Sequence, residues 1–292
     1  MNAASVSLFN VPALLLATLL AMAALTYVLR RMEELTAVSA ALLTGGLALW
    51  LWRLDLTIPV NRFLFIGPQL DITTPLAYLG FTFQLQSGAI PILVTSLLLT
   101  AGAFLLALVV SQGRSFVPLM LILLAGYVVL ALMTSGPLRP PLLGPLLLMA
   151  ISCLGVFVLQ SGRLTYPDGP LRTLIPPALA FPLFLLAAWY IDQIPLNPQD
   201  NGAQQTAGYL LALGLLLLLA PVPLHSAQPA TAQSAPPIAA ALVTLLYQLA
   251  LLHLHFQVVN TYPFVVQGTM FGEWLTWAGL ATTVWAPASK KA

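Results

Sequence analysis

Three histidines and one glutamate are the residues of this chain that could bind a metal or carry a proton in an apolar environment. His225 lies in a proline-rich stretch, and His253, His255 and Glu273 lie within apolar runs. Ionisable groups are costly at membrane depth and usually mark a pathway there. A metal site needs three or four convergent ligands, and a spacing of two puts His253 and His255 on nearly opposite helix faces. We therefore expect these two histidines at a membrane interface, and no metal site.

The other charged residues lie at the ends of apolar runs or in the connections between them. Glu273, near the start of the last run, is expected to reach the outer membrane interface, and a helix–helix contact is the alternative. Cys153 is the single cysteine, which excludes a disulfide framework and a cysteine metal site. The sequence holds no nucleotide-binding glycine loop and no HExxH, GxSxG or CxxC pattern. It offers no catalytic residues of its own and no directly bound cofactor.

Apolar segments make up most of the chain and must position these few polar groups. Of the 292 residues, 60% are hydrophobic and 6% are charged, whereas soluble domains carry about 25% charged residues. Crossing about 30 Å of hydrocarbon takes roughly 20 residues of helix. Nine runs approach that length: residues 10–29, 36–53, 90–111, 115–134, 141–160, 174–191, 207–222, 237–256 and 268–286.

These runs predict an all-α polytopic membrane protein with about nine transmembrane helices. We expect one transmembrane domain over residues 1–292, divided into a three-helix part (1–112), a five-helix part (113–260) and a terminal helix (261–292). Tryptophans such as Trp50 and Trp52 cluster at the ends of runs, as an interfacial aromatic belt requires.

The cations predict the orientation, because Lys and Arg near helix ends favour the cytoplasmic side. With the N-terminus outside and the C-terminus inside, seven of the ten cations lie inside and Arg53, Arg62 and Arg139 lie outside. The seven are Arg30, Arg31, Arg114, Arg163, Arg172, Lys290 and Lys291. No basic stripe with interleaved aromatic residues occurs, so we expect no nucleic-acid partner.

The longest connection, residues 53–91, alternates apolar and polar residues in its second half. In LGFTFQLQ (79–86), Phe83 and Leu85 alternate with Gln84 and Gln86. Alternation with a period of two is typical of a strand with one covered face. We expect a short strand at the membrane surface.

The most unusual segment is PVPLHSAQPATAQSAPP (221–237), between two strongly apolar runs. One interpretation is a proline-stiffened cytoplasmic loop, in which Pro236 and Pro237 start a helix where their missing N–H groups cost nothing. The other is a discontinuous transmembrane helix, because Pro221 and Pro223 prevent regular i to i−4 bonding and free carbonyl groups. Such breaks often accompany ion pathways. We expect the seventh helix to be irregular near Pro221–Pro223.

A Leu/Ala-rich run, then P-L-H, then a small-residue segment that ends in A-P and opens a helix, resembles the antiporter-like membrane subunits of complex I. These subunits share ancestry with multi-subunit sodium/proton antiporters. The residues that carry the resemblance are Pro223, Leu224, His225, Pro229, Ala235 and Pro236, next to Pro221. The resemblance extends over about the whole chain, and this motif is its one specific part.

The chain departs from that family where the family carries protons. Leu218 occupies the position of the family's lysine, and the fifth helix (140–157) holds no carboxylate. The family's second lysine or histidine would fall near Val243 or Leu249, where Gln248 is the only polar side chain nearby. Ala227 and Ala230 replace the tryptophan and aspartate that usually follow P-L-H. The family's second inverted repeat would begin about where residue 292 lies.

The resemblance therefore implies a non-pumping, degenerate antiporter-like subunit, a scaffold in the membrane arm of a complex I-type NADH–quinone oxidoreductase of a bacterial inner membrane. Other membrane subunits and lipids would be its partners. NADH, FMN, iron–sulfur clusters and quinone would be bound by partner subunits. The chain itself would contribute helix packing through small-residue faces such as SAALLTGGLAL (39–49).

Two other classes of function compete with this expectation. A stand-alone transporter for a neutral or hydrophobic substrate needs no intramembrane charge, and the proline-broken helix would line its path. An accessory subunit of a photosynthetic or respiratory supercomplex would hold pigment or haem through His225, His253 or His255. Purification in mild detergent distinguishes the three classes by what the chain carries with it.

Overall fold

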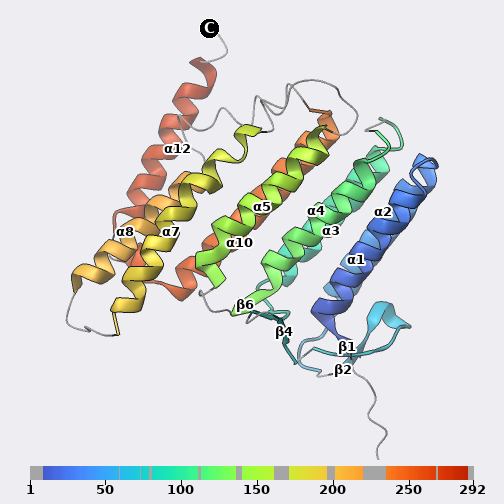
Figure 1. Ribbon diagram of the computed structural model, residues 1–292, viewed down its shortest axis with the longest axis horizontal. Coiled ribbons are helices and arrows are strands. Elements are labelled where there is room, and N and C mark those ends of the chain that lie inside the picture. Colours follow the sequence, from blue (N-terminus) through green and yellow to red (C-terminus); the bar gives the residue numbers. More distant parts are fainter. Residues whose placement is uncertain are drawn as a thin grey trace, which may run out of the picture. The chain divides into compact units, whose positions relative to one another are not determined.

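Long helices dominate the chain (Figure 1). The computed structural model describes residues 9–58, 60–72, 74–78, 81–110, 113–135, 140–160, 171–195, 201–219, 235–267 and 269–288. Nine of the described helices have 17 to 25 residues, and each overlaps one of the nine apolar runs. The expectation of a mostly helical chain is confirmed.

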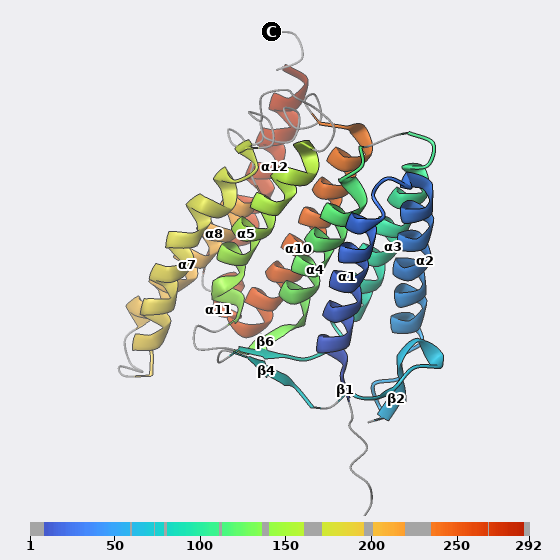
Figure 2. The same cartoon turned by 45° about the vertical axis from the view of Figure 1, so that its right-hand side comes forward.

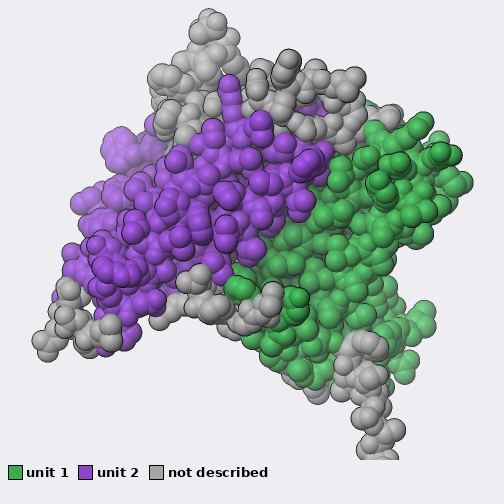
Figure 3. Space-filling view, in the orientation of Figure 1, with its two compact units in different colours: residues 1–137 green, residues 138–292 purple. Residues whose placement is uncertain are grey.

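The chain forms two compact units, residues 1–137 and 138–292 (Figure 3). The boundary lies between the fourth and fifth long helices, inside the segment that the sequence assigns to a five-helix part. The three-part division of residues 1–292 stays a prediction. The units are described separately below.

Unit 1 consists of four long helices and six short strands. The helices are α1 (Val11–Val28), α2 (Glu33–Trp52), α3 (Ile90–Leu106) and α4 (Phe116–Leu132). Helix α2 packs mainly on α3, and α1 mainly on α4. The strands gather at one end of the four helices, which we call the strand end (Figure 2). The α1–α2 and α3–α4 connections form the opposite end, which we call the turn end.

Two three-stranded sheets occupy the strand end. The first has the order β1-β3-β2 and the second β4-β5-β6, and a 3-10 turn, η1 (Phe63–Phe65), follows β2. Strand β3 pairs in parallel with β1 and antiparallel with β2, and β5 pairs antiparallel with both β4 and β6. The strands are β1 (Phe9–Asn10), β2 (Val60–Arg62), β3 (Gln69–Asp71), β4 (Leu76–Tyr78), β5 (Phe81–Phe83) and β6 (Met133–Ser135).

Strand β5 confirms the short strand expected within residues 79–86, although it spans only Phe81–Phe83. The hydroxyl groups of Thr82 and Thr134 lie 3.2 Å apart across the β5–β6 pair. The location of this strand at a membrane surface stays a prediction.

Small residues line the buried face of α2. Ala37, Ala40, Ala41, Thr44 and Ala48 are all buried, and their spacing of three or four residues places them on one side of the helix. The Thr44 hydroxyl donates to the Ala40 carbonyl oxygen at 2.8 Å, so burial leaves it satisfied. The expected small-residue packing face is present, without any charged group in it.

The described elements of unit 2 are all helices. Helix α7 packs on both α8 and α5, and α5 also packs on α10. The short α11 and the last helix, α12, lie against α8. The helices are α5 (Pro140–Gln160), α7 (Ile175–Gln193), α8 (Asn201–Leu218), α10 (Pro237–Thr261), α11 (Phe264–Gln267) and α12 (Phe271–Ala288).

Five helical segments in the described part are long and apolar enough to cross a membrane. They are Val11–Val28, Glu33–Trp52, Leu142–Leu159, Ile175–Gln193 and Pro237–Thr261. Helices α3 and α4 are also apolar but have 17 residues each. These helices agree with a polytopic membrane protein, and the count of nine spans and their orientation stay predictions.

Candidate functional site

The proline-rich motif lies mostly outside the described residues, which resume at Ala235. Pro221, Pro223, Leu224, His225 and Pro229 therefore have no structural description. Both flanks of the motif are described. Helix α8 ends at Leu218, and the next bond of i to i−4 type runs from Leu219 N to Leu215 O at 3.2 Å.

The two flanks agree with what proline chemistry predicts. Helix α8 ends three residues before Pro221, and a proline removes an N–H donor and clashes with the preceding turn. Pro236 is the N-cap of α10, with φ −58° and ψ 138°, and Pro237 is the first helical residue. The expectation that Pro236 and Pro237 start a helix is confirmed. The path between these ends, and so the choice between loop and broken helix, stays open.

A hydrogen bond joins α10 to the end of α8. The Tyr247 hydroxyl donates to the Leu218 carbonyl oxygen at 3.3 Å. The last carbonyl groups of a helix lack partners within the helix, so Tyr247 satisfies one of them from the neighbouring helix. Leu218 itself is fully buried.

The other positions where family charges are expected to be lost lie along α10. Val243 is buried, and Gln248 and Leu249 are half-buried. Leu218 and Val243 thus place apolar side chains in the interior where the resemblance implies charged groups.

The two histidines of α10 have different surroundings, as their spacing predicts. His253 is only 7% exposed, and its Nε2 lies 2.9 Å from Nε2 of Gln257, one turn along the same helix. His255 is half-buried and stacks on Phe271, with ring centroids 5.4 Å apart. His253 is therefore enclosed by protein. This differs from the expectation that both histidines lie at a membrane interface.

Glu273 is exposed in the first turn of α12, where a negative charge interacts favourably with the helix dipole.

No group of three or more His, Cys, Asp or Glu in the described ranges could hold a metal ion. Among these residues, no Asp, Glu, Lys or Arg is buried. The buried Ser, Thr and His side chains of the described part are those of Thr26, Thr36, Thr44, Ser96, Thr100, Ser152 and His253.

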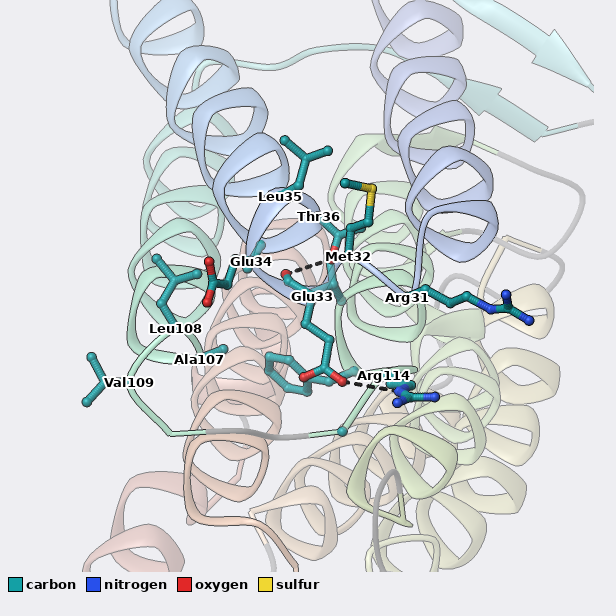
Figure 4. A pocket seen from close by; sticks show the side chains of 14 residues that line it. Arg31, Met32, Glu33, Glu34, Leu35, Thr36, Ala107, Leu108, Val109 and Arg114 are labelled. Atoms are coloured by element: carbon teal, nitrogen blue, oxygen red, sulfur yellow. Dashed lines mark hydrogen bonds and ion pairs between the residues drawn. The ribbon is translucent and has the colours of Figure 1, made fainter.

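Unit 1 holds an open pocket of about 600 Å³ at its turn end (Figure 4). The α1–α2 turn and the start of α2 form one wall, and the α3–α4 connection forms the other. Its charged lining residues are Arg31, Glu33, Glu34 and Arg114. Gly113, with φ 94°, lets the α3–α4 connection turn beside Arg114, because a side chain is strained at that angle.

A separate polar arrangement ties the strand end to α2. Trp50 is 2% exposed, and its indole N–H donates to the Arg62 carbonyl oxygen at 2.9 Å. Its ring meets Phe63 edge to face, with centroids 5.1 Å apart. Trp50 is therefore a buried anchor rather than part of the expected interfacial belt, whereas Trp52 is 73% exposed.

Comparison with known proteins adds no assignment to this geometry. No family model matches the chain, and no curated protein and no solved structure matches it.

Proposed function

We propose that the chain is a non-pumping, degenerate antiporter-like membrane subunit that acts as a scaffold in a complex I-type NADH–quinone oxidoreductase of a bacterial inner membrane. One observation carries the proposal. Across the residues that the structure describes, the interior contains no Asp, Glu, Lys or Arg. Proton transfer through a membrane needs titratable groups whose pKa responds to burial and neighbouring charge. An uncharged interior fits a packing role.

The junction of α8 and α10 supports the same interpretation. In the family that the chain resembles, a lysine precedes the P-L-H motif, and this chain has buried Leu218 there. The Leu218 carbonyl is bonded to the Tyr247 hydroxyl. A helix end capped by a neutral phenol fixes a structural junction without adding a group that titrates near neutral pH.

The assembly is tested by purification of the full chain from its native membrane in mild detergent. Co-migration with a complex that contains flavin and iron–sulfur clusters supports the proposal, with NADH and quinone bound by the partner subunits. A stable complex-free monomer would favour the stand-alone transporter. Bound pigment or haem would favour the supercomplex subunit instead.

Proton inertness is tested at the histidines, of which His253 matters most because it is the buried histidine of α10. His253→Gln keeps hydrogen bonding but cannot titrate near neutral pH. Measured as protons moved per NADH in reconstituted vesicles, the ratio is expected to equal that of wild type, normalised to assembled complex.

The same measurement with His255→Gln and His225→Gln extends the test to the other two histidines. A lower ratio in any of the three variants, with assembly intact, would show that this chain carries protons. That result would overturn the scaffold role even if the chain co-purifies with the complex.

A further inference from the structure

The pocket at the turn end of unit 1 combines two positive and two negative side chains. Glu33 and Arg114 form the one ion pair among the described residues, with Glu33 Oε1 3.4 Å from Arg114 Nε. Because the pair uses Nε, the two terminal guanidinium nitrogens keep donors for another partner. Figure 4 shows Glu34 extending toward the part of the pocket near Leu108, apart from the ion pair.

Two exposed apolar surfaces lead away from this pocket along α2 and α3. On α2, Leu35, Val38 and Leu42 follow one another at spacings of three and four residues and are all exposed, which makes them one stripe. On α3, Leu105 and Leu106 are exposed near the pocket. Leu35 itself lines the pocket, so the charged side chains of the pocket lie next to an apolar surface.

The expected position of the pocket relative to the membrane follows from helix α2. Helix α2 is long and apolar enough to cross a membrane, and the pocket lies at its first turn. The ends of a spanning helix lie at the level of the lipid headgroups. An open pocket with four charged lining residues at that level, continuous with apolar helix faces, has the layout of a phospholipid, with its charged headgroup above its acyl chains.

We propose that this pocket binds a phospholipid whose headgroup carries both a phosphate and a primary ammonium, as phosphatidylethanolamine does. The terminal nitrogens of Arg114, with Arg31 at the rim, would bind the phosphate. The ammonium would donate to the carboxylate of Glu34. Two cations and two anions give the lining residues no net charge, which matches a zwitterionic headgroup better than an anionic one. This inference does not depend on the complex I-type assembly.

The test compares three short-chain lipids on the purified full chain in detergent by native mass spectrometry. The probes are dioctanoyl phosphatidylethanolamine, phosphatidylcholine and phosphatidylglycerol. A primary ammonium has three N–H donors and the choline group has none, so we expect the ethanolamine lipid to bind about threefold more tightly than the choline lipid. Glu34→Gln should remove this preference and leave binding of the choline lipid unchanged.

Glu273→Gln is the matched control, because Glu273 is also an exposed glutamate in the first turn of a helix and lies outside the pocket. It should keep the threefold preference. Equal binding of the ethanolamine and choline lipids to the wild-type chain would overturn the proposal, as would a preference that persists in Glu34→Gln. Tightest binding of phosphatidylglycerol would also overturn it, because the pocket would then act as a simple cationic site. Equal binding in the wild-type comparison overturns the proposal even if Glu34→Gln does not fold.

Discussion

The two units use glycine differently where their helices pack. In unit 1, Gly45 and Gly46 of α2 have room: a Cβ on Gly45 would meet only Ala101 Cβ at 4.0 Å, and one on Gly46 would meet nothing within 4 Å. In unit 2, a Cβ on Gly214 of α8 would lie 2.5 Å from Phe184 Cε2 on α7. A Cβ on Gly144 of α5 would overlap the side chain of Leu254 on α10.

The difference shows that a glycine pair in a sequence does not identify a close contact. Lipid supplies no hydrophobic driving force between helices, so close packing of small residues replaces it. In α2 that packing comes from alanines and Thr44. The neighbouring Gly45 and Gly46 make no contact so close that it requires a glycine. In unit 2 single glycines face a large side chain, and no local pattern marks them.

Gly214→Ala should give the largest loss of stability. Phe184 is fully buried, so its ring has little room to move away from an added methyl group. Overpacking of this kind typically costs about 1–3 kcal/mol. Thermal unfolding of the purified chain in detergent, followed by circular dichroism, measures the effect.

Gly45→Ala is the matched control in unit 1. Its methyl group has space, and alanine is more favourable than glycine in a helix by up to about 1 kcal/mol. The variant should unfold at or above the wild-type temperature. If Gly45→Ala lost more stability than Gly214→Ala, the contrast between the units would be wrong.

The next prediction concerns the anchor of the strand end. Trp50→Phe removes the hydrogen bond to the Arg62 carbonyl and leaves a space in a buried site. We expect a loss of about 1–2 kcal/mol in the same unfolding measurement. Trp52→Phe is the control, because Trp52 is exposed, and it should change stability by less than about 0.5 kcal/mol. Equal effects of the two changes would contradict the anchor role.

A smaller effect is expected at the corresponding tie in unit 2. Tyr247→Phe removes the hydroxyl that bonds the Leu218 carbonyl and keeps the ring. The net loss should be about 1 kcal/mol. Hydrogen exchange at the last turn of α8 should also rise, because its carbonyl end loses a partner. Unchanged exchange at residues 215–219 would show that the tie does not hold the end of α8.

The sequence predicts the long helices well because each one follows a continuous apolar run. Boundaries differ where polar residues join a helix: α8 begins at Asn201, six residues before its apolar run, and α10 continues to Thr261, five residues beyond its run. That extension explains why His253 is enclosed, since it lies about two turns before the helix end rather than at it. The polar helix formers that follow the apolar run, such as Gln257, are the sequence signal for this extension of α10.

The sheet that contains β3 could not be predicted from local patterns. Its strands have two or three residues each, and Phe9 pairs with Leu70, about 60 residues along the chain. Such short strands carry too few residues for an alternation to be recognised. The partners of Gly144 and Gly214 are similarly remote in sequence. The sequence pattern therefore points to the small-residue stretch 39–49, although its glycines are in less crowded surroundings than Gly144 and Gly214.

The smallest expected effect is electrostatic and lies outside the helices of unit 1, at Asp55. The Thr57 hydroxyl donates to Asp55 Oδ1 at 2.7 Å and the Thr57 backbone N–H donates to the same oxygen at 2.9 Å. These two bonds hold the pKa of Asp55 below its ordinary value, and the bond from the Thr57 hydroxyl has the larger effect. A lowered pKa in the folded chain stabilises it at pH values above the unfolded pKa of about 4, and this contribution is lost as the pH falls through the folded pKa. Thr57→Val removes the hydroxyl and keeps the backbone N–H, so the pKa of Asp55, measured by carboxyl NMR titration, should rise part of the way to its ordinary value. Thr57→Ser keeps the hydroxyl and should keep the low pKa, and a pKa that is the same in the Val and Ser variants would show that the hydroxyl is not its cause.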